Sequence, residues 1–164
     1  MEYNKNLEIV FKNLFSKGAF LTVDSGEKVN TMTISWGSIG YMWRRPVFMV
    51  LVRSSRYTYE IIENSDSFTV SIPFDNEEMS KALKICGTKS GRDIDKTNEA
   101  NITFIPSKEV DSPVVDNCNI YYECKIVYKQ KMDPSLILDD NIKSLYDNDF
   151  HTLYYGEIVA CYEK

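Results

Sequence analysis

The chain is poor in histidine: its 164 residues include only one, His151, near the C-terminal end. A serine or cysteine hydrolase would have to use this residue as its base, and the sequence holds no G-x-S-x-G turn to present a nucleophile. One imidazole also cannot supply a histidine-rich metal site. We therefore expect neither a catalytic triad nor a metal centre, and we assign no catalytic residue.

Paired cysteine motifs are lacking as well. No two of the four cysteines have the two intervening residues of a zinc knuckle or a dithiol redox motif; they are Cys86, Cys118, Cys124 and Cys161. Free cysteine behaves as a small apolar side chain. We therefore expect thiols that are buried or lie on the surface without a role.

An excess of positive charge is missing, and so is any long apolar run. Nineteen basic and 24 acidic side chains give a formal charge of −5, which disfavours a protein that neutralises many nucleic-acid phosphates. No apolar run approaches the ~18 residues of a membrane-spanning helix, and Lys5, Glu8 and Lys12 interrupt the first segment where a signal peptide would be apolar. We expect a cytoplasmic protein that binds neither nucleic acid nor membrane.

The chain does have the composition of a folded protein rich in strands. Hydrophobic residues make up 43% and aromatic residues 13%, and the length suits a single domain over residues 1–164. About six or seven segments have strand character, whereas the G-x-G-x-x-G turn of a dinucleotide-binding fold is absent. We predict a mainly β fold, an antiparallel barrel with short helical decorations.

Periodicity predicts the individual elements. Apolar residues at helical spacing indicate an N-terminal helix that ends near Gly18, and β-rich runs indicate a hairpin within 19–36. We predict a turn at 37–40, followed by a strand at 47–52 that is buried on both faces because it is apolar throughout. Alternation at 119–131 predicts a strand with one buried face.

The segment 53–58 concentrates chemistry that suits a phosphate group. Two guanidinium groups, several hydroxyls and the free N–H groups of a helix start fall within six residues, namely Arg53, Ser54, Ser55, Arg56, Tyr57 and Thr58. The alternative is a solvated turn whose arginines pair with surface carboxylates. Spacing alone leaves both interpretations open.

The segment C86-G-T-K-S-G-R-D-I-D-K96 is a second candidate for anion binding. Its glycines allow close approach of the backbone, and Lys89, Arg92 and Lys96 gather positive charge in an acidic protein. The spacing of a Walker loop is absent, and a flexible loop of mixed charge is the alternative. Two such segments in one small protein favour a phosphorylated ligand.

The segment N30-T-M-T-I-S-W36 offers contacts for a flat heteroaromatic ring. The Asn30 amide, neighbouring hydroxyls and strand backbone can pair with the polar edge of a ring, and Trp36 can stack on it or wall the site. The alternative is that Met32, Ile34 and Trp36 are core residues of a hairpin.

Four ordered segments resemble the flavin reductase-like family of FMN-binding split barrels, in particular its flavoredoxin branch. They are N30-T-M-T-I-S-W-G-S-I-G-Y-M-W-R-R-P46, V52-R-S-S-R-Y-T58, F68-T-V-S-I-P73 and C86-G-T-K-S-G-R-D-I-D-K96. The resemblance is collinear over roughly residues 18–105. It implies a Greek-key split β-barrel that forms a homodimer and binds one FMN per subunit, without a covalent bond, near the subunit interface.

The resemblance also implies which residues contact the cofactor. Asn30, Met32, Thr33 and Trp36 would lie along the isoalloxazine ring, on a strand that includes Thr31. The segment 53–58 would meet the ribityl chain and the phosphate. A loop with Ser90, Arg92 and Lys96 would close over the phosphate, and Lys96 would be the favoured cation.

We therefore expect an FMN-binding oxidoreductase or electron carrier whose flavin is reduced by NADH or NADPH. A bound flavin supplies the redox chemistry itself, which fits a chain with no catalytic base. One alternative is a flavoprotein that passes electrons between protein partners and reacts poorly with nicotinamide nucleotides. Another is a module that binds a different phosphorylated aromatic ligand, or a haem with His151 as its axial ligand.

Overall fold

A computed structural model describes residues 2–164 of the chain. Seven strands form one antiparallel sheet in the order β2-β1-β5-β8-β9-β4-β3, and β6 and β7 pair separately. The strands are β1 (Ala19–Asp24), β2 (Val29–Ile34), β3 (Gly37–Met42), β4 (Arg45–Arg53), β5 (Ser67–Ile72), β6 (Phe104–Ile105), β7 (Val114–Val115), β8 (Ile120–Lys131) and β9 (His151–Glu163).

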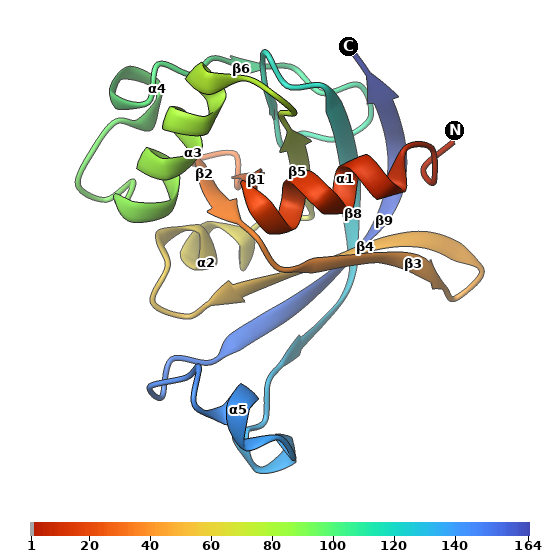
Figure 1. The fold of residues 1–164 in the computed structure, drawn as a ribbon, viewed down its shortest axis with the longest axis vertical. Coiled ribbons are helices and arrows are strands. Elements are labelled where there is room, and N and C mark those ends of the chain that lie inside the picture. Colours follow the sequence, from red (N-terminus) through yellow and green to blue (C-terminus); the bar gives the residue numbers. More distant parts are fainter. Residues whose placement is uncertain (1) are drawn as a thin grey trace.

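The helices are short and lie around this sheet (Figure 1). They are α1 (Leu7–Ser16), α2 (Tyr57–Ile62), α3 (Glu77–Thr88), α4 (Lys96–Glu99) and α5 (Asp140–Lys143). The N-terminal helix ends as predicted, with Gly18 at a φ of 92° just beyond it. Within residues 2–164, no helix combines the length and the apolar character needed to cross a membrane.

The two edges of the sheet are joined by a very short link. The edge strands β2 and β3 are consecutive in the chain, and only Ser35 and Trp36 lie between them. The sheet therefore coils until its edges meet at this link, although β2 and β3 do not pair with each other. We call the open line between these two edges the seam. This arrangement confirms the predicted split barrel with helical decorations.

The inside of the barrel holds the larger apolar core. Its fully buried members include Leu21, Phe48, Val50, Phe68 and Tyr122. The strand predicted at 47–52 lies between two others, but the prediction that both its faces are buried was wrong. From Phe48 to Arg53 its side chains alternate between buried and half-buried positions, so the outer face at Met49 and Leu51 is only partly covered. That outer face includes Leu51, which reappears at the candidate site.

A second apolar cluster covers the outer face of the sheet at β1, β5 and β8. It joins α3 to the segment 100–118 and includes Phe20 and Tyr121. The prediction of one buried face for 119–131 was therefore wrong in its first half, where both faces are buried. There the buried Glu123 carboxylate accepts hydrogen bonds from the backbone of the covering segment, at the N–H groups of residues 108 and 109.

The hairpin β3–β4 also departs from the sequence prediction. The predicted turn at 37–40 is instead the start of β3, because pairing with β4 overrides the local preference of its glycines. The turn lies at Trp43 and Arg44, between the paired residues Met42 and Arg45. Both turn residues have positive φ, 51° and 61°, as a type I′ turn requires.

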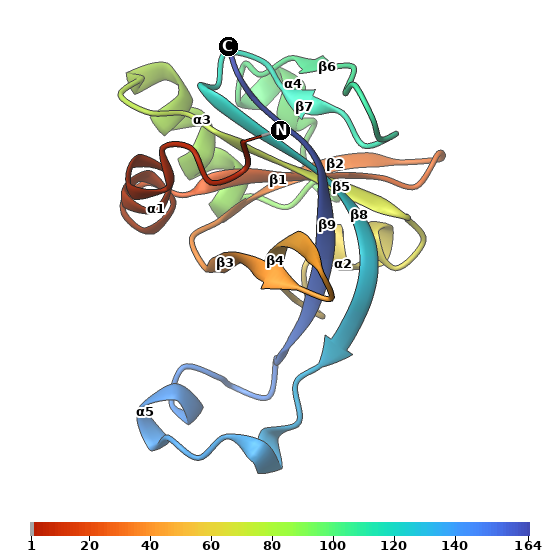
Figure 2. The same cartoon turned by 90° about the vertical axis from the view of Figure 1, so that its right-hand side faces the viewer.

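Residues 132–150, between β8 and β9, form an excursion that we call the arm. The arm contains α5 and projects away from the barrel in two perpendicular views (Figures 1 and 2). Several of its apolar side chains are exposed, and Leu138 is 95% exposed. At the base of the arm, Met132 N–H donates to the His151 carbonyl over 3.0 Å, which continues the pairing of the two strands.

Candidate functional site

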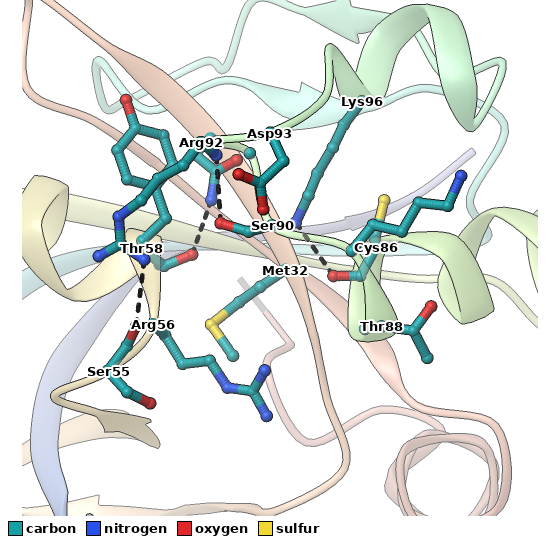
Figure 3. A pocket seen from close by; sticks show the side chains of 15 residues that line it. Met32, Ser55, Arg56, Thr58, Cys86, Thr88, Ser90, Arg92, Asp93 and Lys96 are labelled. Carbon is teal, nitrogen blue, oxygen red and sulfur yellow. Dashed lines mark hydrogen bonds between the residues drawn. The ribbon is translucent and has the colours of Figure 1, made fainter.

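Two neighbouring cavities lie on one side of the barrel and share Met32 and Arg56. The first, which we call the basic cavity, has a volume of about 220 Å³ and lies between β2, the start of α2 and the segment 86–96 (Figure 3). The second, the seam cavity, has a volume of about 210 Å³ and lies where β2 leads toward β3. The two cavities therefore adjoin each other, and residues of β2, β4 and β9 line them.

Most of the residues predicted from the sequence line these two cavities. Those at the basic cavity are Asn30, Met32, Ser55, Arg56, Tyr57, Thr58, Ser90, Arg92 and Lys96. Those at the seam cavity are Met32, Thr33, Trp36, Arg53 and Arg56. Three segments that are distant in the sequence are thus brought together.

Two predicted residues, Thr31 and Ser54, line neither cavity. Thr31 is fully buried between β1 and β2, where its hydroxyl donates to the carbonyl of Leu21 over 3.2 Å. The Ser54 hydroxyl instead donates to the carboxylate of Asp149 in the arm, over 3.0 Å. Because side chains alternate along a strand, Thr31 faces away from its neighbours Asn30 and Met32.

Close packing holds the wall of the basic cavity in place. The Asn30 amide donates to the Thr58 hydroxyl over 2.9 Å and so connects β2 to α2. Opposite them, a Cβ atom added at Gly91 would overlap the side-chain oxygen of Asn30 and would lie 3.0 Å from the ring of Tyr57. Only glycine allows the segment 86–96 to approach this closely.

The basic cavity concentrates positive charge in a protein of net charge −5. Its lining includes four cationic side chains, Arg56, Lys89, Arg92 and Lys96, and the single carboxylate of Asp93. Such a distribution attracts an anionic ligand more strongly than the net charge of the chain suggests.

Two of these cations already have carboxylate partners. Arg92 forms an ion pair with Glu60, donates to the Ser55 carbonyl over 3.2 Å and lies 5.2 Å from the centroid of the Tyr57 ring. Lys89 lies 3.4 Å from Glu99. These contacts orient the wall of the cavity and neutralise part of its charge.

Lys96 is held differently, as a buried ammonium group. It is 7% exposed and donates to the carbonyls of Thr31 and Cys86 over 2.7 and 3.0 Å. Burial lowers its pKa, and the Arg56 cation acts in the same direction. Within residues 2–164 it has no carboxylate partner. It therefore supplies a fixed charge beneath the cavity.

Arg56 has no side-chain hydrogen bond and no ion pair within the described part of the chain. It is exposed, lines both cavities, and extends its guanidinium group into open space near Met32 (Figure 3). It is therefore the cation that a ligand anion can engage without displacing a protein partner.

The first part of the predicted phosphate segment anchors the arm. The Arg53 guanidinium group donates to the carbonyls of Leu145 and Asp149 over 3.1 and 3.0 Å. The Asp149 carboxylate accepts from the hydroxyls of Ser54 and Ser55. Burial raises the pKa of Asp149, but these hydrogen bonds outweigh that effect and leave the pKa below its ordinary value.

The seam cavity is walled by two aromatic rings, one of which the sequence did not assign to the site. Trp36 is 42% exposed, and its ring centroid lies 5.5 Å from that of His151. His151 enters the site because β9 pairs with β4 and places it opposite Arg53. No local motif reveals this pairing, which joins residues 98 positions apart, so only the register of the sheet could have assigned His151 to the site.

His151 is held as a neutral imidazole. Burial lowers its pKa from 6.5 to about 4, and the neighbouring Arg53 cation acts in the same direction. The neutral ring can donate one hydrogen bond and accept another.

The thiols near the site are unreactive. Cys86 lines the basic cavity, and burial raises its pKa to about 11, so that it stays protonated at neutral pH. Cys118 and Cys124 are buried elsewhere, as expected, and Cys161 is half-buried. Within residues 2–164, no group of three or more histidine, cysteine or acidic residues is placed to hold a metal ion.

The family to which the chain belongs follows from its sequence as a whole. The model of the Flavin reductase like domain family matches residues 13–164, so the chain belongs to this family. This match confirms the resemblance found in the segments between residues 18 and 105, and extends it to the C-terminal strands. It defines the class of the protein, a flavin-binding redox protein.

Particular relatives are similar to this chain over most of its length. The flavoredoxin of Desulfovibrio vulgaris is 25% identical, with a TM-score of 0.68 over 90% of this chain and 70% of that chain. A flavoredoxin of Methanosarcina acetivorans is also 25% identical, with a TM-score of 0.69 over 90% of this chain and 68% of that chain. An uncharacterized protein of Archaeoglobus fulgidus is 29% identical over 146 residues, which are 89% of this chain and 72% of that protein.

Proposed function

We propose that the chain binds FMN across the two cavities and is an FMN-dependent oxidoreductase whose flavin is reduced by NADH or NADPH. The phosphate lies in the basic cavity, and the isoalloxazine ring lies in the seam cavity beside Trp36 and His151. Each cavity alone, at about 220 and 210 Å³, is smaller than the roughly 300–1,000 Å³ typical of a cofactor pocket, whereas the two together fall within that range.

The observation that carries this proposal is the position of Arg56. Its unpaired guanidinium group lines both cavities, and the buried ammonium group of Lys96 lines the basic cavity. A phosphate dianion needs charge-assisted donors of this kind, and a guanidinium group can bind it through two parallel hydrogen bonds.

The residues of the chain bind and orient the cofactor. When bound, FMN supplies the redox chemistry, so that no side chain has to act as a nucleophile. Arg56 and Lys96 hold the phosphate end, Met32 covers the middle of the groove, and Trp36 shields the ring from water. This division of roles agrees with a site in which no catalytic triad can be formed.

The visible absorption spectrum tests the proposal directly. The protein is saturated with FMN, desalted, and then mixed with NADH or NADPH without oxygen. We expect flavin bands that survive desalting and bleach with one of the two nucleotides. Bands that survive but do not bleach would contradict the nicotinamide step and indicate an electron carrier. Loss of the bands on desalting would overturn FMN binding.

The variant Arg56→Ala tests the assignment of the phosphate end. Because the lost contact is charge-assisted, we expect FMN to bind about 10- to 100-fold more weakly and riboflavin to bind almost unchanged. Both affinities are measured by quenching of flavin fluorescence. The control Lys12→Ala removes one positive charge from an exposed position on α1 and is expected to leave both affinities unchanged. Equal losses for FMN and riboflavin would show that Arg56 is structural.

We further propose that the protein is a homodimer in which the arm of one subunit packs against the other. The arm carries apolar side chains that stay exposed within the described residues 2–164, namely Leu136, Leu138, Ile142 and Leu145. Exposed apolar residues gathered on one projecting segment are typical of a protein interface.

A further inference from the structure

The side chain of Tyr146, in the arm, contacts His151, which lines the seam cavity. Its hydroxyl oxygen lies 2.8 Å from Nδ1 of His151, and its ring meets the imidazole edge-on at a centroid distance of 5.4 Å. Tyr146 also stacks on Phe150 at 5.0 Å and lies beneath the Arg53 guanidinium group at 4.9 Å. The tyrosine is therefore fixed on several sides, and its hydroxyl has a defined direction.

The other ring nitrogen of His151, Nε2, is free to bind a ligand. Nε2 has no hydrogen-bond partner in the described part of the chain, whereas every fully buried side-chain nitrogen and oxygen there has one. Nε2 must therefore be accessible, although His151 as a whole is only 7% exposed. His151 lines the seam cavity, and we infer that this cavity is the opening to which Nε2 is exposed.

The contact with Tyr146 determines which ring nitrogen carries the proton. The Tyr146 hydroxyl has two acceptors in reach, Nδ1 of His151 and, at 3.4 Å, the sulfur of Met132. A thioether sulfur is a weak acceptor, so the phenolic proton is donated to the imidazole nitrogen. The proton of the neutral ring is then on Nε2.

The charges around His151 keep the ring neutral when this hydrogen bond forms. Arg53 and Arg56 disfavour a second proton, as burial does, and Asp149 opposes them. The Asp149 carboxylate is already occupied by the hydroxyls of Ser54 and Ser55. The seam cavity therefore contains a neutral N–H donor beside two arginines.

We propose that Tyr146 is a positioning residue that holds His151 as the Nε2–H tautomer, so that Nε2 donates a hydrogen bond to an acceptor atom on the edge of the bound flavin ring. This proposal rests on the proposed function for the identity of the ligand. The donor atom thus belongs to the barrel, whereas Tyr146, the residue that fixes the tautomer, belongs to the arm. Movement of the arm away from the barrel would free the imidazole to turn or to change tautomer.

Nitrogen NMR tests the tautomer without any flavin. His151 is the one histidine of the chain, so a long-range ¹H–¹⁵N spectrum contains a single imidazole pattern that needs no assignment. In the full, flavin-free chain at pH 7 we expect a protonated Nε2 and an unprotonated, hydrogen-bonded Nδ1. A protonated Nδ1, in the neutral or the charged ring, would overturn the proposal.

The variant Tyr146→Phe removes the hydroxyl and retains the ring that stacks on Phe150 and Arg53. We expect the Nδ1 resonance to move toward that of a free, unprotonated imidazole nitrogen. The control Tyr155→Phe removes a hydroxyl that has no bond to His151 from the same strand, and is expected to leave the pattern unchanged. An unchanged Nδ1 resonance in Tyr146→Phe would overturn the role of Tyr146.

Adding FMN tests the second half of the proposal. We expect the Nε2 resonance to shift when the protein is saturated with FMN. We also expect Tyr146→Phe to weaken the binding of FMN and of riboflavin alike by about 2- to 10-fold, which is the effect of one neutral hydrogen bond. The equal effect on both ligands separates this ring contact from the phosphate contact of Arg56. If FMN does not bind, the proposed function is wrong, and so is the contact of His151 with a flavin. The tautomer of His151 is tested separately, by the spectra without flavin. An Nε2 resonance that FMN leaves unchanged would overturn the contact with the ring.

Discussion

His151 is the residue at which burial, charge and pairing of strands meet. It lies opposite Arg53 in the β4–β9 register, and Tyr146 covers its Nδ1 from the arm. Its low pKa is a consequence of this environment and makes the stability of the fold depend on pH.

We predict that His151 makes folding sensitive to mild acid. Its pKa is about 4 in the folded protein and 6.5 as the reference for the unfolded chain, so the unfolded chain binds more protons between these values. Stability is therefore complete above pH 6.5 and falls as the pH decreases toward 4. Between pH 7.5 and 5 the loss from this group is about 2 kcal/mol.

Chemical unfolding of the wild type and of His151→Asn at both pH values measures this loss. The difference between the two pH values should be about 2 kcal/mol smaller in the variant. The comparison cancels the carboxylates, which titrate in both proteins. An identical pH dependence would show that His151 is as accessible to protons in the folded chain as in the unfolded one.

At the scale of single elements, local pattern predicts a strand well and its surroundings poorly. The hairpin β1–β2 and the N-terminal helix follow from alternation, helical spacing and glycine positions, which are local properties. The two buried faces of the first half of β8 do not, because the covering segment 100–118 is placed by tertiary packing.

The candidate site also combines residues that local pattern predicts with residues that only tertiary contacts place there. Asn30, Arg56 and the segment 86–96 were found because each carries its chemistry in a short stretch of sequence. The role of Ser54 and the place of His151 depend on contacts with residues almost 100 positions away in the chain, and no local signal marks such contacts.

The turn of the β3–β4 hairpin offers a test at this scale. Arg44 has a φ of 61°, which costs a residue with a Cβ atom roughly 1 kcal/mol relative to glycine. We predict that Arg44→Gly stabilises the protein by about 1 kcal/mol, measured by urea unfolding. Arg44→Ala retains the Cβ atom and should stay near the wild type. Equal stabilities of the two variants would show that the turn is relaxed in solution.

At the scale of the whole molecule, the arm is the feature that distinguishes this barrel from a closed, self-contained one. It projects from the barrel in both views, yet its base is held by Arg53 and by the pairing of Met132 with His151 (Figure 2). An arm that is fixed at its base and apolar near its end is suited to pack against the second subunit of the proposed homodimer.

We predict that Leu138→Glu weakens the proposed homodimer by at least about 10-fold, because it places a charge where an apolar side chain would be buried. Sedimentation equilibrium over a range of concentrations measures the dissociation constant. Ser16→Glu introduces the same charge on an exposed position of α1 and serves as the control. A wild-type protein that stays monomeric at all concentrations would refute the dimer itself.

The pairing of β4 with β9 has a consequence for how the molecule is made. Residues 45–53 leave the ribosome about 100 residues before their partner at 151–163, so β4 has only β3 beside it for most of synthesis. The seam cavity, where we propose that the flavin ring binds, lacks one wall until His151 has emerged. Contacts so distant in sequence form slowly, so at the proposed site the pairing of β9 with β4 is the step that completes the surface for the flavin ring.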